Sequence, residues 1–161
     1  MIGFNKTKED FGWLGNMSAH PIVYKNERWR TSEALFQALR FNDELIIDEI
    51  RMKASPMSAK MCAKRYRESM IVIPRSEEDL KNMATCLYLK FTQNPEIGKW
   101  LVETGDELIY ENVEARKNSS SAQYWGAYLE GGKLVGQNVL GNLLMALRKK
   151  LSSHDQATTE I

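Results

Sequence analysis

The chain has 161 residues, and 43% of them are hydrophobic. This apolar content is enough to bury the core of one compact domain and leaves little room for a second. The 22 lysines and arginines against 21 aspartates and glutamates give a formal net charge of +1. That balance excludes a global electrostatic attraction to nucleic acid or to an anionic membrane, so any polyanion would have to bind at a local basic patch.

The cysteines and the amino-terminal residues indicate the cellular compartment of the protein. Cys62 and Cys86 form no Cys-x-x-Cys pair and lie in segments with a helical pattern, which favours buried thiols in a reducing environment. The first ten residues lack the apolar core of a signal peptide, and no apolar run is long enough to span a bilayer. We therefore expect a cytoplasmic protein without a membrane segment. His20 and His154 are too isolated for a metal-ligand cluster, so no metal site is expected.

The first half of the chain predicts short strands followed by helices. Apolar and aromatic residues alternate over 2–4 and again over 20–31 around a polar Lys-Asn turn, which suggests a small antiparallel sheet or ribbon. The apolar period then becomes helical, and helices are predicted over residues 31–41, 43–54, 55–69 and 76–94. Residues that suit N-caps begin three of them: Thr31 or Ser32, Ser55 and Ser76.

The second half is less regular. A helix is expected from Pro95 to near Gly105, and a strand over 107–113. Residues 112–137 form a long connection without periodicity, a length that in compact domains is usually functional or mobile. A final helix starts near Asn138, and a flexible tail is expected over 152–161. The fold class predicted is a helix-dominated α+β domain.

Glu33 is the first candidate for chemistry. It falls in the first turn of a predicted helix, where unpaired backbone N–H groups and the helix dipole favour a negative charge. An ionised carboxylate suits a general base for water, or a counter-charge for a developing cation. The alternative, a glutamate that only stabilises the start of its helix, stays open.

Trp125 lies in the polar connection and not on an apolar stripe. It either closes the core over the helix ends or offers its flat face to a planar ligand. Glycines nearby would let the backbone approach a phosphate or ribose, although they match neither the dinucleotide fingerprint nor the P-loop: Gly126, Gly131, Gly132 and Gly136. Asn138 is also typical of a plain N-cap.

Three cations share one helical face at three- and four-residue spacing: Lys60, Lys64 and Arg67. Such a group is able to clamp a phosphate. A solvated surface face is the commoner outcome for a charge run of this kind, and that alternative stays open as well.

Seven stretches in register carry a resemblance: FGWLGNM, WRTSEALFQALRF, ASPMSAKMCAK, MATCLYLKFTQNP, VETGDELIYEN, YWGAY and GQNVLGNLLMALRKKL. From about Phe4 to Leu151 the chain resembles the YbiA-like, or NADAR, family, whose members act on N-ribosyl bonds in phosphoribosylamino-pyrimidines of riboflavin synthesis or in ADP-ribose conjugates. The resemblance implies one YbiA-like domain over residues 1–151 and an N-glycosidase without cofactor or metal. Its implied partners are a small ribosyl phosphate or an ADP-ribose-type ligand, or else ADP-ribosylated nucleic acid.

The resemblance also assigns roles. Glu33 matches the glutamate regarded as catalytic in the family, and Gly15 with Asn16 falls on a Ser-Asn turn near the ligand. Trp125 and Gly126 match the family's Trp-Gly pair. Further positions implied near the substrate are the asparagine of the GxNxLG motif and three that are commonly basic: Asn138, Arg40, Lys60 and Lys90. In the resulting hypothesis Glu33 stabilises the cationic sugar and aims water, Trp125 holds the base or ribose, and Lys60 with Arg40 holds the phosphate.

One departure from the family pattern bears on activity. The family typically has an aspartate three residues before the tryptophan, and this chain has Ala122. Glu111 or Glu114 is a candidate to replace the missing carboxylate, and we count Glu111 among the catalytic candidates. The alternative function is a catalytically impaired module that binds ADP-ribose or NAD. Whether Ala122 is natural or introduced stays open.

Overall fold

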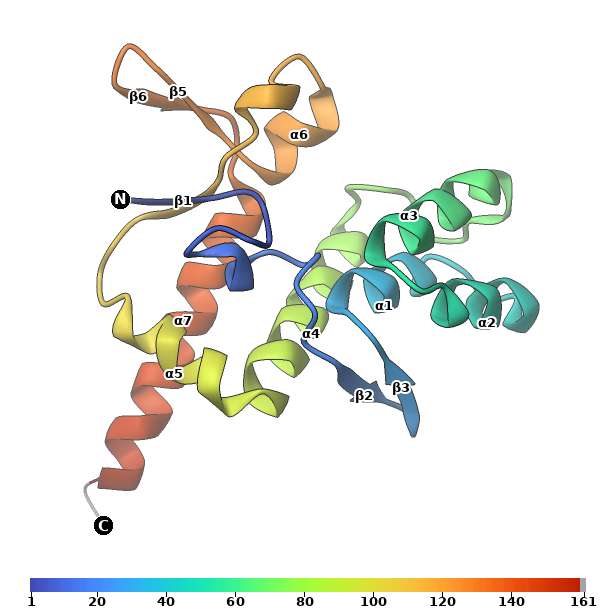
Figure 1. Cartoon of the computed structure of the whole chain (residues 1–161), viewed down its shortest axis with the longest axis horizontal. Helices are drawn as coiled ribbons and strands as arrows, with labels where there is room; N and C mark the ends of the chain where they lie inside the picture. Colours follow the sequence, from blue (N-terminus) through green and yellow to red (C-terminus); the bar gives the residue numbers. More distant parts are fainter. Residues whose placement is uncertain (160–161) are drawn as a thin grey trace. The chain divides into compact units, whose positions relative to one another are not determined.

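The computed structural model describes residues 1–159, and side chains as far as residue 153 (Figure 1). It divides into two compact units, one over Asn16–Pro95 and the other over Met1–Gly15 together with the chain from Glu96 onward. The side chain of His154 and residues 160–161 lie outside the described part.

The unit over Asn16–Pro95 contains a β-hairpin and a group of helices. Strands β2 (Ile22–Tyr24) and β3 (Glu27–Trp29) pair antiparallel, as predicted, and turn at Lys25 and Asn26, which both have positive φ. The helices follow in chain order: α1 (Ser32–Ala38), α2 (Glu44–Met52), α3 (Pro56–Arg65), the 3-10 turn η2 (Arg67–Ser69) and α4 (Glu77–Gln93). The predicted caps are confirmed, since the side chains of Thr31, Ser55 and Ser76 each accept a backbone N–H of the first turn.

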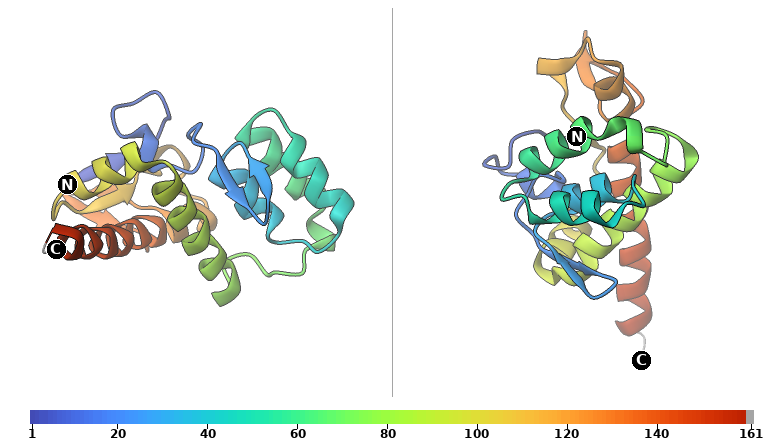
Figure 2. Two further views of the ribbon diagram at one scale, coloured as in Figure 1. Left: turned by 90° about the horizontal axis from the view of Figure 1, so that it is seen from below. Right: turned by 90° about the vertical axis from the view of Figure 1, so that its right-hand side faces the viewer.

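Helix α1 lies at the centre of this unit, against α2, α3 and α4 (Figures 1 and 2). Every residue of α1 is buried, including its polar ones. The apolar core around it includes Leu35, Phe36, Ile50, Leu87 and Phe91. Because a buried polar group is costly without a partner, the polar side chains of α1 must be satisfied by one another or by neighbouring helices.

In the other unit β1 (Ile2–Phe4) pairs in parallel with β4 (Ile109–Glu111). Both strands were predicted, but the expectation that residues 2–4 join the antiparallel hairpin is wrong. Alternating apolar residues identify a strand without identifying its partner, and here the partner lies a hundred residues away along the chain. The 3-10 turn η1 (Gly12–Leu14) and helix α5 (Pro95–Glu103) belong to the same part of the chain.

The connection over 112–137 is structured, so the prediction of a segment without regular elements is wrong. It holds the 3-10 turn η3 (Glu114–Arg116), helix α6 (Ser120–Trp125) and a hairpin of β5 (Tyr128–Glu130) and β6 (Lys133–Val135). The hairpin turns at Gly131 and Gly132, with φ of 57° and 80°. Two positive φ values are what a tight hairpin turn requires, and α6 is too short to show a helical period in the sequence.

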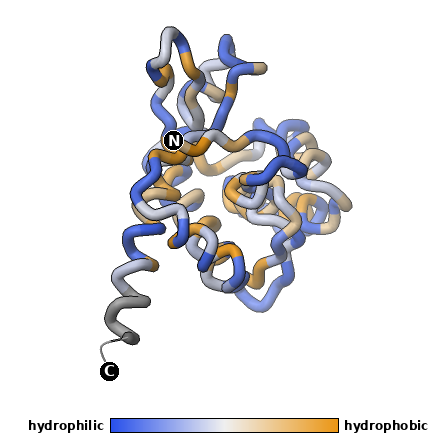
Figure 3. The backbone as a smooth tube through the Cα atoms, turned by 60° about the vertical axis from the view of Figure 1, so that its left-hand side comes forward, coloured by the Kyte–Doolittle hydropathy of each residue, from blue (hydrophilic) through white to orange (hydrophobic). Residues whose placement is uncertain are grey.

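Helix α7 (Val139–Thr159) begins directly after Asn138, as predicted. It continues to Thr159, so the segment expected as a tail from residue 152 is helical for most of its length. The fold is α+β and dominated by helices, as expected. Among the described residues no helix is long and apolar enough to cross a membrane. Figure 3 agrees, because apolar and hydrophilic residues alternate along the helical backbone.

Candidate active site

Glu33 lies in the first turn of α1 and is only 8% exposed. Its backbone N–H donates to the carbonyl of Asn16 at 3.3 Å, and the next N–H, of Ala34, donates to Thr31 Oγ1 at 3.2 Å. The backbone N–H groups of the first turn of α1 therefore find acceptors in Thr31 and in the carbonyl of Asn16. This fixes the backbone from which the Glu33 side chain projects.

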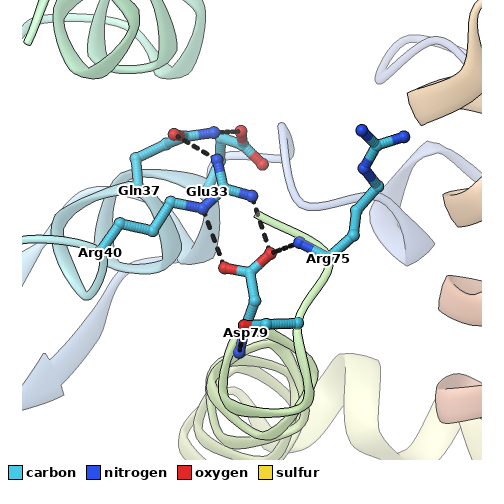
Figure 4. Close-up of polar contacts among 6 residues, drawn as sticks. Glu33, Gln37, Arg40, Arg75 and Asp79 are labelled. Carbon is cyan, nitrogen blue, oxygen red and sulfur yellow. Dashed lines mark hydrogen bonds and ion pairs between the residues drawn. The ribbon is translucent and has the colours of Figure 1, made fainter. Parts of the chain in front are cut away.

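The two carboxylate oxygens of Glu33 differ (Figure 4). Oε1 accepts a hydrogen bond from Gln37 Nε2 at 2.8 Å. Oε2 accepts none within the described part of the chain, and it is not among the fully buried unpaired polar atoms there, which are Trp29 Nε1 and Arg51 Nε. Oε2 therefore reaches accessible surface. A carboxylate with one oxygen held and one open to a ligand suits a general base or a counter-charge for a cation.

Asn16 is buried beside the start of α1. Its Oδ1 accepts from Ser32 Oγ at 2.7 Å, and its Nδ2 lies 2.9 Å from Met83 Sδ. Both ends of the amide are thus engaged within the protein. Asn16 holds the first turn of α1, which carries Glu33. This positioning contact is separate from the substrate-binding role predicted for Asn16.

Arg40 is 9% exposed and forms a forked ion pair with the fully buried Asp79 of α4. Nε and one terminal nitrogen each lie 2.9 Å from a different oxygen of Asp79. The other terminal nitrogen donates to Gln37 Oε1 at 3.4 Å. The guanidinium, which was expected to hold phosphate, is thus occupied by Asp79 and Gln37. Gln37 and Asp79 were not predicted, although Gln37 and Arg40 follow Glu33 at helical spacing.

Lys90 and Lys60, the other predicted cations, differ in burial. Lys90 is fully buried, with Nζ 5.1 Å from the centre of the Phe91 ring, and burial lowers its pKa to about 7. Lys60 on α3 is half-buried and forms no ion pair or side-chain hydrogen bond with described residues. Of these two lysines, Lys60 is the one placed to meet an anion from solvent.

The thiol of Cys86 reports on the charge around Glu33. Burial raises the pKa of Cys86, and the negative charges of Glu33 and Asp79 raise it further. Cys86 is thus a buried thiol near the negative charges of Glu33 and Asp79.

Trp125 is the last residue of α6 and is half-buried. Its ring meets Tyr124 edge to face, with centroids 4.8 Å apart. The next residue, Gly126, has no room for a side chain, because a Cβ would lie 2.5 Å from the Glu111 carbonyl oxygen and from Val113 Cγ1. The Trp-Gly pair is thus explained locally by close packing of Gly126 against β4.

Asn138 joins this packed turn to β4. Its Nδ2 donates to the Ile109 carbonyl at 2.9 Å, its Oδ1 accepts from the Glu111 N–H at 3.3 Å, and its own N–H donates to the Gly126 carbonyl at 3.0 Å. With φ of 51° it adopts the left-handed conformation that asparagine tolerates. Both ends of its side chain serve the backbone, so it acts on the Trp-Gly turn by positioning.

The carboxylates considered as replacements for the missing aspartate are both paired. Glu111 Oε1 accepts from Arg116 at 3.1 Å, and Glu114 pairs with Lys117 at 3.1 Å. Ala122 itself is 4% exposed in α6. Gly15 closes the turn η1, where its N–H donates to the Gly12 carbonyl at 3.2 Å.

The predicted site residues thus form two local clusters. Asn16 and Glu33 come together at the start of α1, and Gln37 links Glu33 to Arg40 beyond the end of that helix. Glu111, Gly126 and Asn138 come together around the turn after α6 that also carries Trp125. Lys60 makes no hydrogen bond or ion pair with either cluster among the described residues.

Comparison with known proteins identifies the family of the chain. Residues 3–152 match the NADAR domain. The chain belongs to the NADAR domain family. A NADAR relative named N-glycosidase YbiA, from Escherichia coli K12, is 36% identical over 154 residues, which cover 94% of this chain and 89% of the relative. An N-glycosidase of Nostoc punctiforme is 30% identical, with 93% of this chain and 92% of the relative covered. These relatives support an enzyme of the N-glycosidase class.

The NADAR fold is also known from a solved structure. The NMR structure of E. coli YbiA matches with a TM-score of 0.77 and 32% identity, covering 96% of this chain and 88% of that one. A longer relative from Vibrio vulnificus is named a riboflavin biosynthesis protein, is 28% identical, and has only 39% of its length covered. The helix-dominated α+β fold is therefore shared with YbiA.

Proposed function

We propose that this NADAR protein is an N-glycosidase that hydrolyses the N-ribosyl bond of a phosphoribosylamino-pyrimidine. The observation that carries the proposal is the Glu33 carboxylate, which is buried, fixed by Gln37 through Oε1 and open at Oε2. The names of the relatives support the reaction class, and the riboflavin biosynthesis protein supports this kind of substrate. An ADP-ribosyl conjugate such as ADP-ribosylated guanosine is the competing substrate.

In the proposed reaction the bond between the anomeric carbon and the nitrogen breaks as the sugar becomes oxocarbenium-like. The negative charge of Glu33 stabilises that cation, and Oε2 accepts a proton from the water that attacks the anomeric carbon. The departing nitrogen takes up a proton, so the reaction consumes one water and yields a free amine and ribose phosphate. Lys60 holds the phosphate, and the face of Trp125 holds the base or ribose.

The balanced charge of the chain favours a small substrate. A conjugate on nucleic acid would need an extended basic approach surface, which a net charge of +1 does not supply. We further propose a cytoplasmic enzyme, supported by the two free cysteines, Cys62 and Cys86. ADP-ribosylated nucleic acid is thereby the less favoured partner.

The test is release of free base from each substrate by the unaltered protein and by Glu33→Gln. Glu68→Gln is a matched control, because Glu68 is exposed in η2 of the same unit. We expect release from the phosphoribosylamino-pyrimidine by the unaltered protein and the control, and none above background by Glu33→Gln. Release of base from the ADP-ribosyl conjugate alone would make that conjugate the substrate in place of the phosphoribosylamino-pyrimidine. Release by Glu33→Gln equal to that by the unaltered protein would overturn the role of Glu33.

Ala122 motivates a second candidate function, a binding module for ADP-ribose or NAD that has lost turnover. The position where the family has a carboxylate is a buried methyl group in α6, and the nearby Glu111 is paired with Arg116. Calorimetry combined with product analysis separates the two functions. A binding module retains intact ligand indefinitely, and Ala122→Asp restores release of the base, whereas an enzyme forms product without that change.

A further inference from the structure

A series of polar contacts joins α1 to α4 in the unit over Asn16–Pro95. Glu33 and Gln37 lie one turn apart on α1, and Arg40 follows two residues after the helix ends at Ala38. On α4, the carboxylate of Asp79 holds Arg40 in an ion pair. The hydrogen bonds and the ion pair that join Glu33, Gln37, Arg40 and Asp79 connect buried side chains (Figure 4).

The orientation of the Gln37 amide follows from its neighbours. A guanidinium has only donors, so the group that Arg40 contacts must be the amide oxygen. The amide nitrogen then points the other way, where it donates to Glu33 Oε1 at 2.8 Å. Arg40 thus determines that the amide nitrogen of Gln37, and not its oxygen, faces the Glu33 carboxylate. A reversed amide would place the Gln37 oxygen next to a Glu33 oxygen, and the two would repel each other.

Arg40 is itself held in place. Both oxygens of Asp79 engage it at 2.9 Å, and Asp79 Oδ2 also accepts the Arg75 backbone N–H at 2.8 Å. Figure 4 shows the guanidinium of Arg40 between Asp79 and Gln37, with dashed lines to both. A forked pair of this kind fixes direction as well as distance.

The charges explain why an amide stands between Arg40 and Glu33. Asp79 neutralises Arg40, so the cluster of Glu33, Arg40 and Asp79 keeps one net negative charge at Glu33. A guanidinium bonded directly to Glu33 would cancel that charge. The neutral amide transmits the orientation of Arg40 without its charge.

On the basis of the proposed function, we infer that Arg40 and Asp79 are positioning residues that act through Gln37 to hold the Glu33 carboxylate for reaction. They align the reacting oxygen and do not touch the substrate. Gln37 is the only member of the three that contacts Glu33 by a hydrogen bond among the described residues.

A double-mutant cycle on kcat and KM tests the inference. Gln37→Met removes both hydrogen bonds of the amide at similar size, and we expect kcat to fall about tenfold with KM within about twofold. Arg40→Lys keeps the charge opposite Asp79 but loses the fork, and we expect kcat to fall several-fold with KM unchanged. In the Gln37→Met background Arg40→Lys should have no further effect on kcat, because its link to Glu33 is already absent.

Asp79→Asn provides a second arm if Arg40→Lys does not fold. It keeps the shape of the side chain, and it too should lower kcat in the unaltered background and not in Gln37→Met. Gln93→Met is the matched control, because Gln93 also uses both amide ends, on the backbone of Val23, away from Glu33. We expect this variant to lower the melting temperature while leaving kcat unchanged.

The outcomes separate the two proposals. If Gln37→Met and Arg40→Lys only lower the melting temperature, or if their effects on kcat multiply in the double variant, the positioning role is wrong. A rise in KM alone for Arg40→Lys would indicate that Arg40 binds phosphate, and this result would also overturn the positioning role. If the unaltered protein releases no base, the proposed function fails and this inference falls with it.

Discussion

Gln37 Nε2 donates to Glu33 Oε1 at 2.8 Å, one helical turn along α1. This bond engages Oε1 and leaves Oε2 as the oxygen that acts in the proposed reaction. The proposed chemistry depends on that asymmetry.

Trp125→Ala should raise KM by about three- to tenfold, because an aromatic contact of this kind contributes roughly 0.5–1.5 kcal/mol beyond its buried area. Trp125→Phe should recover part of the loss, since it keeps a flat face. Steady-state kinetics measure both, and Trp100→Phe is the control because Trp100 is an exposed tryptophan on α5. An unchanged KM in Trp125→Ala would assign the indole to packing alone.

Lys60→Ala should raise KM for a phosphorylated substrate by about tenfold, because it removes a half-buried ammonium from the proposed phosphate site. The exposed Lys64, one turn away on α3, provides Lys64→Ala as a control with little effect. Added salt should weaken binding by the unaltered protein more than by Lys60→Ala. Equal salt dependence in the two proteins would remove Lys60 from the site.

Lys90 predicts a pH dependence of stability. Burial lowers its pKa to about 7, below the ordinary value of about 10.4 that applies in the unfolded chain. Between these values the unfolded chain binds the proton and the folded chain does not, so this residue makes the free energy of unfolding rise with pH. Below about pH 7 both states are protonated, and the cost of burying the charge is constant.

The measurement is urea unfolding of the unaltered protein and of Lys90→Met at pH 7 and pH 9. Because one pH unit corresponds to about 1.4 kcal/mol, the stability advantage of Lys90→Met should shrink by roughly 2 kcal/mol between these two values. Comparing the two proteins removes the contribution of other titrating groups. A difference that stays constant with pH would mean that Lys90 keeps its proton in the folded state.

Gly126→Ala should lower the free energy of unfolding by about 2–3 kcal/mol, since the new methyl group would overlap the Glu111 carbonyl and Val113. Gly131→Ala is the control. Gly131 has φ of 57° with no atom within 4 Å of its missing Cβ, so only the cost of the left-handed conformation applies, about 1 kcal/mol. Urea unfolding would contradict this account if both variants were equally stable.

Local sequence signals predicted most of the fold. The caps Ser55 and Ser76 predicted the starts of α3 and α4, because a cap and its first turn lie within a few residues. The partner of β1 and the short elements over 112–137 escaped prediction. Strand pairing over a hundred residues leaves no local trace, and six-residue helices show no period.

The candidate site was predictable to the same extent. Glu33 was found because the start of a helix is a local feature with a known electrostatic sign. The ion pair of Asp79 has no such local signal, since its partner Arg40 lies 39 residues earlier and their contact depends on the packing of α1 on α4. The phosphate role expected for Arg40 came from the family resemblance alone, and the burial of α1 on every side is not visible in its apolar stripe.

The most direct test of the central claim is the single-turnover rate of base release by Glu33→Gln, measured together with the affinity for the intact substrate. We expect a rate at least about a thousandfold lower, with a Kd within a few-fold of the unaltered protein, because the amide keeps the shape but neither stabilises the cation nor accepts the proton. A rate equal to that of the unaltered protein would contradict the account.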